Sequence, residues 1–443
     1  MFYLARQWLD RRDATFAAVL YAVNPYHIVI VYWRSAFAEL LASSLLPLLL
    51  LLLLRACESR ISGRQHQVTV PLAVVFACAW LTNAPAAVMV HYSAALLALL
   101  LAYLYRSPRV LFIAAAAVAL GAALASFYLL PAIYEQRWVD IAQAVSAGSR
   151  PAESFLFIHT TDPDHDAFNR IVSWVAVSEF FVTALAAWCA RRWRKRNPVL
   201  WYALGTWSLV CAVLMLPVSS PLWNILPKLQ FMQFPWRWML CMGVPFSLLV
   251  TFGIRRWLWR GVCYAVLLCV IALVWHHYQA PWWETADDLR EIQDNVSSHA
   301  GYEGTDEYTP LGADASAVNR TAPQVTVEGS PQAPIKVTEW QAERKAFTAN
   351  LPAPGNFVLH LFNYPAWSVK VNGHVVHPAT REDTGQMLVP AQPGENQVEI
   401  SFRRTWDRTL GGCISLLALI IILVLKRIEF SRLSQAGSFV NNH

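Results

Sequence analysis

Arg34 and Glu39 are the residues whose positions most clearly suggest chemistry, because both stand between two long apolar runs. Ionisable groups at membrane depth are costly, so they usually face a cavity, a partner or an aqueous rim. The planar fork of an arginine can bind a phosphate or a carboxylate, and a glutamate can act as an acid or base or can hold the arginine. The alternative is a structural ion pair at the start of a helix. Their spacing on an ideal helix does not bring the two side chains together.

Gln233 and Arg237 form a second candidate pair, where a polar loop meets another apolar run. One interpretation makes the aromatic residues around them an interfacial belt, from which Arg237 reaches lipid headgroups. The other places both side chains in the same cavity as Arg34, in contact with an anionic lipid headgroup. Pro235 fixes the geometry of the loop in either case.

Asp162, Asp164 and Asp166 alternate along a polar segment that also contains His159 and His165. Carboxylate oxygens at such spacing are suited to a divalent cation such as Ca²⁺, Mg²⁺ or Mn²⁺, which is the only cofactor the sequence suggests. The run lacks the glycine and the distant glutamate of an EF-hand loop. A solvated acidic turn before the next helix is the alternative.

The segment Gly301–Pro310 is unusually dense in tyrosine and acidic residues. It either folds back over a membrane cavity, where Glu307 and Tyr308 make polar contacts, or packs only on the domain that follows it. The sequence leaves both interpretations open.

The composition predicts a polytopic membrane protein, since 56% of the 443 residues are hydrophobic and only 14% are charged. The net charge of +6 does not indicate a nucleic-acid partner, because the basic residues form short clusters between apolar runs. The partner they indicate is a lipid bilayer. All eight cysteines lie in or beside apolar runs, which predicts neither a disulfide framework nor a cysteine zinc site.

About ten apolar runs approach the roughly 20 residues that a membrane-spanning helix needs. They are residues 14–33, 37–54, 68–82, 85–105, 110–132, 171–190, 199–217, 238–254, 261–279 and 409–425. The break around Asn83 divides the third run from the fourth, although a single kinked helix is the alternative. The basic clusters lie on one side of the membrane only if the third and fourth runs are two separate spans. The positive-inside rule then places these clusters and both termini in the cytoplasm.

The predicted fold class is an α-helical polytopic membrane protein with an external antiparallel β-sandwich domain before the last helix. Residues 1–279 hold about nine spans, 280–334 form an external connector, 335–407 form the β-sandwich, and 408–443 hold the final span and a cytoplasmic tail. Alternating apolar and polar residues predict strands at Phe357–Phe362, Trp367–Val371 and Gln397–Phe402. Asn372 and Gly373 predict a tight hairpin turn.

Several motifs occur in an order that resembles the bacterial membrane proteins labelled 6-pyruvoyl-tetrahydropterin-synthase-related. The motifs are Pro25-Tyr26-His27, Arg34, Glu39, Leu81–Pro85 with Asn83, Gln233–Arg237, Gly304–Pro310 and Tyr364–Gly373. The architecture also resembles the C superfamily of membrane glycosyltransferases. That resemblance implies a polyprenyl-phosphate-linked sugar as donor, a site at the outer face of the bacterial cytoplasmic membrane, and an acidic residue on the first external loop. We find no such loop here, so we expect the chain to lack an N-terminal part.

The leading hypothesis is therefore a glycosyltransferase-like membrane protein with Glu39 as its candidate catalytic residue. The candidate substrate and lipid-phosphate residues are Arg34, Gln233, Arg237, Tyr26, Asn83, Glu307 and Tyr308, and the β-domain would position an envelope acceptor. The alternative is a non-catalytic membrane protein whose external β-domain binds an envelope glycan or a protein partner. A transporter is less well supported, because we find no inverted internal repeat.

Overall fold

The computed structural model describes residues 1–58, 66–278, 286–297, 308–314, 317–319, 322–329 and 334–440 of the chain. The chain divides into two compact units. The helical unit comprises Met1–Leu129, Val145–Pro281 and Gly412–His443, and the β unit comprises Leu130–Ala144 and Trp282–Gly411.

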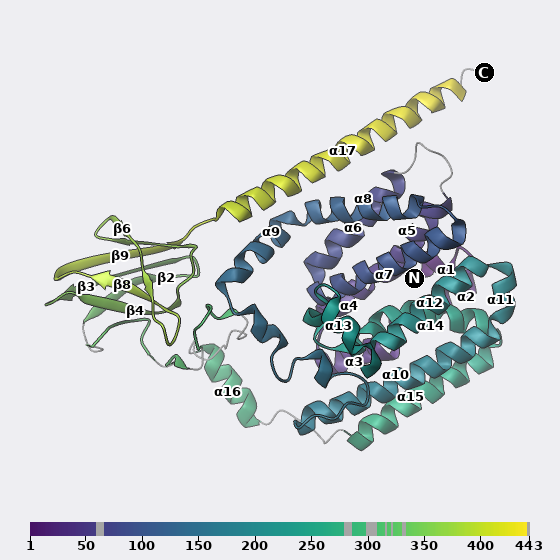
Figure 1. The fold of residues 1–443 in the computed structure, drawn as a ribbon, viewed down its shortest axis with the longest axis horizontal. Helices are drawn as coiled ribbons and strands as arrows, with labels where there is room; N and C mark the ends of the chain where they lie inside the picture. The colour runs from purple at the N-terminus through teal and green to yellow at the C-terminus, as the bar shows by residue number, and fades with distance from the viewer. Residues whose placement is uncertain are drawn as a thin grey trace. The chain divides into compact units, whose positions relative to one another are not determined.

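Helices joined by short turns and loops make up the helical unit (Figure 1). The α-helices of the chain are α1 (Phe2–Ala5), α2 (Arg11–Ala22), α3 (Pro25–Val29), α4 (Phe37–Ser43), α5 (Leu45–Glu58), α6 (His66–Thr82), α7 (Ala84–Tyr105), α8 (Arg109–Leu124), α9 (Ser126–Glu135), α10 (Pro163–Cys189), α11 (Arg191–Arg196), α12 (Pro198–Leu214), α13 (Ser220–Ile225), α14 (Met239–Gly253), α15 (Trp257–Tyr278), α16 (Ala286–Ser297) and α17 (Trp406–Val440). A π-helical turn, η1 (Ile30–Arg34), follows α3. Short 3-10 turns are η2 (Gln136–Trp138), η3 (Ile141–Val145), η4 (Pro151–Glu153), η5 (Pro217–Ser219), η6 (Leu229–Met232) and η7 (Pro235–Trp238).

Six helices in the described part of the chain are long and apolar enough to cross a membrane, or up to eight if each of two bent helix pairs is one span. The six are Arg11–Arg34, Phe37–Glu58, Ala84–Tyr105, Pro163–Cys189, Trp257–Tyr278 and Trp406–Arg427. The bent pairs are Arg109–Leu124 with Ser126–Trp138, and Pro198–Leu214 with Pro217–Ile225. These candidate spans agree with the predicted polytopic helical fold. The count of about ten and the external placement of the β-domain stay predictions.

Two of the predicted spans correspond to short helices. Helix α6 has 17 residues and α14 has 15, and a 15-residue helix rises only about 22 Å against a hydrocarbon core of about 30 Å. Every residue of α14 from Met239 to Phe252 is buried, so protein rather than lipid surrounds it. The predicted break at Asn83 separates two helices in the structure, because α6 ends at Thr82 and α7 begins at Ala84.

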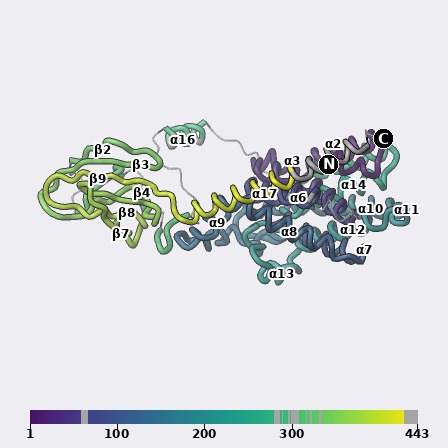
Figure 2. Tube along the Cα trace, turned by 90° about the horizontal axis from the view of Figure 1, so that it is seen from above, coloured from purple at the N-terminus to yellow at the C-terminus, as the bar shows by residue number. Residues whose placement is uncertain are grey.

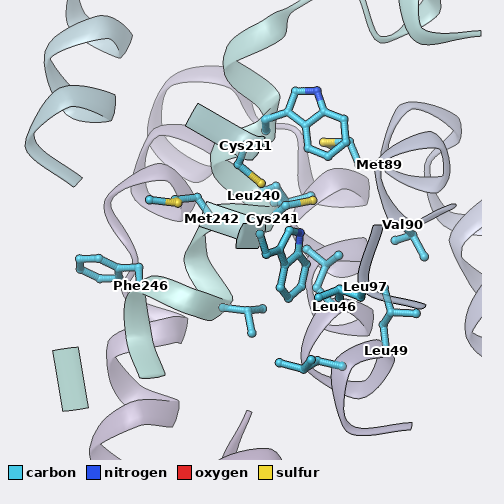
Figure 3. Packing of buried hydrophobic residues seen from close by; sticks show 14 of the residues in the cluster. Leu46, Leu49, Met89, Val90, Leu97, Cys211, Leu240, Cys241, Met242 and Phe246 are labelled. Atoms are coloured by element: carbon cyan, nitrogen blue, oxygen red, sulfur yellow. The ribbon is translucent and has the colours of Figure 1, made fainter. Parts of the chain in front are cut away.

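The core of the helical unit is formed where α5, α7, α12 and α14 meet. Figure 3 shows Leu46 of α5, Met89 of α7, Cys211 of α12 and Leu240 and Phe246 of α14 packed together. All five are buried. Because lipid is as apolar as these side chains, van der Waals fit between the helices has to hold such a core together.

Helices α6 and α8 approach closely at a glycine. A Cβ atom at Gly121 would lie 2.7 Å from the Ala73 carbonyl oxygen and 2.8 Å from Cβ of Phe76. No larger residue fits there without a shift of α6. Small residues at helix contacts allow this kind of close backbone approach in membranes.

The β unit holds two antiparallel sheets. Its strands are β1 (Val325–Val327), β2 (Ile335–Trp340), β3 (Arg344–Leu351), β4 (Gly355–Phe362), β5 (Trp367–Val371), β6 (His374–Val376), β7 (Ala379–Thr380), β8 (Gln386–Ala391) and β9 (Gly394–Phe402). One sheet has the order β1-β4-β8-β7, and the other has the order β2-β3-β9-β5-β6. Figure 2 shows β2 and β3 in one layer, and β4, β8 and β7 in the other.

A single apolar core lies between the two sheets. Phe347 of β3 and Phe357 of β4 come from different sheets and meet edge to face, with ring centroids 5.0 Å apart. Both side chains are fully buried. The hairpin prediction is confirmed, because Asn372 (φ 50) and Gly373 (φ 81) connect β5 to β6 with positive φ angles. The three predicted strands correspond to β4, β5 and β9.

Candidate functional site

A broken stretch of backbone carries Arg34 and Glu39. Pro25 cannot continue α2, and the Asn24 side chain caps α3 by accepting a hydrogen bond of 2.9 Å from the Tyr26 amide. The chain then widens into the π-helical turn η1, and π-turns often occur at functional sites. Ser35 ends this turn with a left-handed backbone (φ 48), and α4 begins two residues later.

This break brings the two charges together, although an ideal helix would separate them. Arg34 Nη1 lies 2.7 Å from Glu39 Oε2. The Tyr26 hydroxyl donates a hydrogen bond of 2.7 Å to Glu39 Oε1 and accepts one of 3.2 Å from Arg34 Nη1. Tyr26 is fully buried and Glu39 is 1% exposed.

Arg237 joins this group from the loop before α14. Its Nε lies 3.5 Å from Glu39 Oε2, and its Nη1 donates a hydrogen bond of 2.7 Å to the Met232 carbonyl oxygen. Gln233 shapes the loop, because it has a positive φ of 63° between η6 and η7. We call Tyr26, Arg34, Glu39 and Arg237 the arginine cluster.

Aromatic rings cover both guanidinium groups of the arginine cluster. The Arg34 guanidinium lies 4.7 Å from the ring centroid of Trp236, and that of Arg237 lies 4.8 Å from the centroid of Phe234. The two rings are themselves stacked, with centroids 4.9 Å apart. Cation–π contacts of this kind partly replace the water that a buried cation loses.

The arginine cluster has an unbalanced charge. Arg34 and Arg237 both face the single carboxylate of Glu39, so one positive charge lacks an anionic partner among the residues of the cluster. Arg237 Nε has no hydrogen bond within the described structure and is within ion-pair distance of Glu39 only. Because buried charges need partners, the site is suited to an additional anion.

The other predicted ligand residues have different surroundings. Asn83 caps α7, because its side chain accepts a hydrogen bond of 2.9 Å from the Ala86 amide. Glu307 lies outside the described residues. Tyr308 belongs to the β unit, where its side chain is 62% exposed and its carbonyl oxygen accepts a hydrogen bond from the Tyr364 hydroxyl. Burial raises the pKa of Tyr364 to about 12.

Asp162, Asp164 and Asp166 lie at the N-terminus of α10. The Asp162 side chain accepts hydrogen bonds from the amides of Asp164 (2.9 Å) and His165 (3.3 Å), which caps α10. Asp166 pairs with Arg170 at 2.9 Å. In the described parts of the chain we find no group of three or more His, Cys, Asp or Glu side chains that could hold a metal ion. A divalent cation at Asp162, Asp164 and Asp166 stays a prediction.

The helical unit holds a buried acid that was not predicted. Glu179 of α10 is fully buried, and its Oε1 accepts a hydrogen bond of 2.7 Å from Asn24 Nδ2. A lone glutamate in an apolar run was the available signal. Its contact ties α10 to the helix break that precedes the arginine cluster.

The apolar helices and the buried charges together define a membrane protein with several spans. A family model described as "6-pyruvoyl-tetrahydropterin synthase related domain; membrane protein" matches residues 1–280. The match covers more than half of the chain, so the chain belongs to this family. It includes all four residues of the arginine cluster and ends before the first strand. No curated protein and no solved structure matches the chain.

Proposed function

We propose that this protein is a membrane glycosyltransferase that binds a polyprenyl-phosphate-linked sugar at the arginine cluster. The observation that supports this most directly is the convergence of two arginines on one buried carboxylate. The cluster then has an unpaired positive charge at the end of a candidate span, where a phosphate attached to a lipid would arrive. We propose that this end faces the outside of the bacterial cytoplasmic membrane.

Arg34 is the residue of the cluster best placed to meet the phosphate. Its side chain is 14% exposed, against 10% for Arg237 and 1% for Glu39. A guanidinium fork can bind two phosphate oxygens at once, which an ammonium cannot do with the same geometry. Arg237 adds charge behind Arg34, because its position is fixed by the Met232 carbonyl oxygen.

An apolar groove, which a row of aromatic rings connects to the cluster, suits the lipid chain. It has a volume of about 540 Å³ and is lined by Ile28, Leu268, Ile271, Ala272, Trp275 and His276. A row of aromatic contacts leads from the groove to the cluster: Trp275 to Trp33 (4.9 Å between centroids), Trp33 to Phe168 (5.1 Å) and Phe168 to Trp236 (5.4 Å). Trp236 lies under Arg34. We propose that a prenyl chain runs from the groove along these rings and brings its phosphate to the two arginines.

The geometry favours a positioning role for Glu39. A general base needs a free lone pair within hydrogen-bond reach of the acceptor hydroxyl. Glu39 instead accepts from Tyr26 on one oxygen and faces two guanidinium groups with the other. We propose that Glu39 holds both arginines at the phosphate, and that it would have to leave this network to take a proton.

The proposed topology places the β unit on the same external side and both termini in the cytoplasm. Support comes from the positive-inside rule applied, with all ten predicted spans counted, to the basic clusters that begin at Arg6, Arg55, Arg106 and Arg191. In this arrangement the β unit would position the envelope acceptor.

Sugar transfer from a polyprenyl-phosphate donor tests the proposal. We expect Arg34→Ala to slow transfer about tenfold to hundredfold, because it removes a charge-assisted contact to phosphate. Arg34→Lys should recover only part of the rate, since it keeps the charge without the fork. Arg150→Ala, at an exposed arginine of the same unit, should transfer at the normal rate.

If Arg34→Ala transfers sugar at the same rate as the unaltered protein, Arg34 does not bind the donor phosphate. If the unaltered protein binds the donor and transfers nothing, the alternative function gains support, in which the β unit binds an envelope glycan or a protein. Size-exclusion elution of each variant shows whether it has kept its fold.

A further inference from the structure

We propose that a groove between α2 and α15 binds an acidic phospholipid. The groove has a volume of about 550 Å³ and is lined by Arg11, Arg12, Thr15, Phe16, Val19 and Trp257. It lies at the opposite end of the candidate span Arg11–Arg34 from the arginine cluster, so it is a separate site. The proposal does not depend on sugar transfer.

Two arginines occupy an unfavourable position at this groove. Arg11 and Arg12 are the first two residues of α2, where the positive end of the helix dipole repels cations. Two acids lie close by, but Asp10 caps α2 by accepting a hydrogen bond of 2.8 Å from the Asp13 amide, and Asp13 pairs at 2.7 Å with Arg260. Within the described residues, neither Arg11 nor Arg12 has a carboxylate partner. An acidic headgroup would supply the missing anion.

The wall of the groove is already rigid. Phe16 and Trp257 meet edge to face with centroids 5.2 Å apart, and the buried Arg260 guanidinium lies 4.7 Å from the Phe16 centroid and 5.2 Å from that of Trp257. Arg260 is fixed in turn by a hydrogen bond of 2.8 Å to the Thr251 carbonyl oxygen. The Arg12 guanidinium also lies 4.7 Å from the Trp257 centroid. A ligand would therefore find the walls in place.

The order of residues along α2 favours a lipid over a soluble anion. Arg11 and Arg12 lie at the helix start, Thr15 and Phe16 one turn further, and Val19 another turn on. Val19 is 54% exposed, so apolar surface continues from the groove beyond the charged end of α2. A soluble phosphate would use only the charged end. A phospholipid would fill both ends, and basic pockets between membrane helices bind acidic lipid headgroups.

Native mass spectrometry of the full chain in detergent can count bound lipids. The probes are phosphatidylglycerol and phosphatidylcholine with the same acyl chains. We expect phosphatidylglycerol to bind at least tenfold more tightly, and Arg11→Gln with Arg12→Gln to weaken it about tenfold to thirtyfold while phosphatidylcholine binding stays the same. Val19→Trp should weaken both lipids, because it fills the apolar end without altering charge.

Arg191→Gln with Arg192→Gln is the matched control, because Arg191 also lies over a tryptophan ring, 4.4 Å from the centroid of Trp188. It should bind phosphatidylglycerol normally. Three results would each overturn the proposal: an equal loss of phosphatidylglycerol affinity in this control, equal affinity for the two lipids, or no effect of Val19→Trp. Lipid binding would then be explained by the general positive charge of the surface. If the double variant does not elute as a single species, Arg11→Gln alone is judged by the same criterion.

Discussion

Replacing Glu39 with alanine should lower the free energy of unfolding by about 3–5 kcal/mol, because it leaves two buried guanidinium groups without a carboxylate. Glu39 is 1% exposed, and its oxygens are engaged by Tyr26, Arg34 and Arg237. Removing one partner of a buried charge network costs far more than the network itself contributes, since the remaining charges stay desolvated. Glu39→Gln should have a similar effect, because it keeps the shape and loses the charge.

Thermal or denaturant unfolding of the full chain in detergent measures this effect. Glu58→Ala is the matched control, because Glu58 is an exposed acid at the end of α5. It should change the free energy of unfolding by less than about 0.5 kcal/mol. Adding Arg237→Met to Glu39→Gln should restore part of the loss, because one unpaired charge is removed. A Glu39→Ala protein as stable as the Glu58→Ala protein would show that the arginine cluster is not a coupled network.

Replacing Phe347 with alanine should destabilise the β unit by about 3–5 kcal/mol, because it opens a cavity in a core that the hydrophobic effect stabilises. Phe347 is fully buried and contacts Phe357 across the two sheets. Unlike the helical unit, this core is formed by removing apolar surface from water. The loss should therefore include the transfer free energy of the ring as well as the cavity cost.

Limited proteolysis of the full chain under increasing denaturant reports the opening of the β unit. Val375→Ala in β6 is the control, because that side chain is 60% exposed and fills no core position. The Phe347→Ala protein should be cleaved within 335–407 at a clearly lower denaturant concentration than the control. Identical cleavage of the two variants would contradict a shared core between the sheets.

Local signals in the sequence predicted the β unit well. Alternation placed β4, β5 and β9, because each strand turns one side chain in two toward the core. Asn372 and Gly373 predicted their turn because they tolerate positive φ. The pairing of β1 with β4, and of β3 with β9, joins distant segments and had no local signal.

The sequence identified the charges of the arginine cluster but not how they meet. Ideal helix geometry separates Arg34 from Glu39, and only the π-helical turn followed by the left-handed Ser35 brings them together. The sequence also identified Arg237 as a candidate. Its approach to within 3.5 Å of Glu39 depends on the positive φ of Gln233, and a glutamine does not predict that backbone conformation. Span counting from apolar length could not reveal that protein surrounds α14.

Equilibrium binding of a long-chain polyprenyl phosphate, compared with the uncharged polyprenol of the same length, tests the central claim most directly. The account predicts that the unaltered protein binds the phosphate at least about tenfold more tightly than the alcohol, since charge-assisted contacts contribute about 1.5–3 kcal/mol. It also predicts that Arg34→Ala loses most of this preference while its affinity for the alcohol stays the same. Equal affinity for the two ligands, or a full preference kept by Arg34→Ala, would contradict a phosphate site at Arg34 and Arg237.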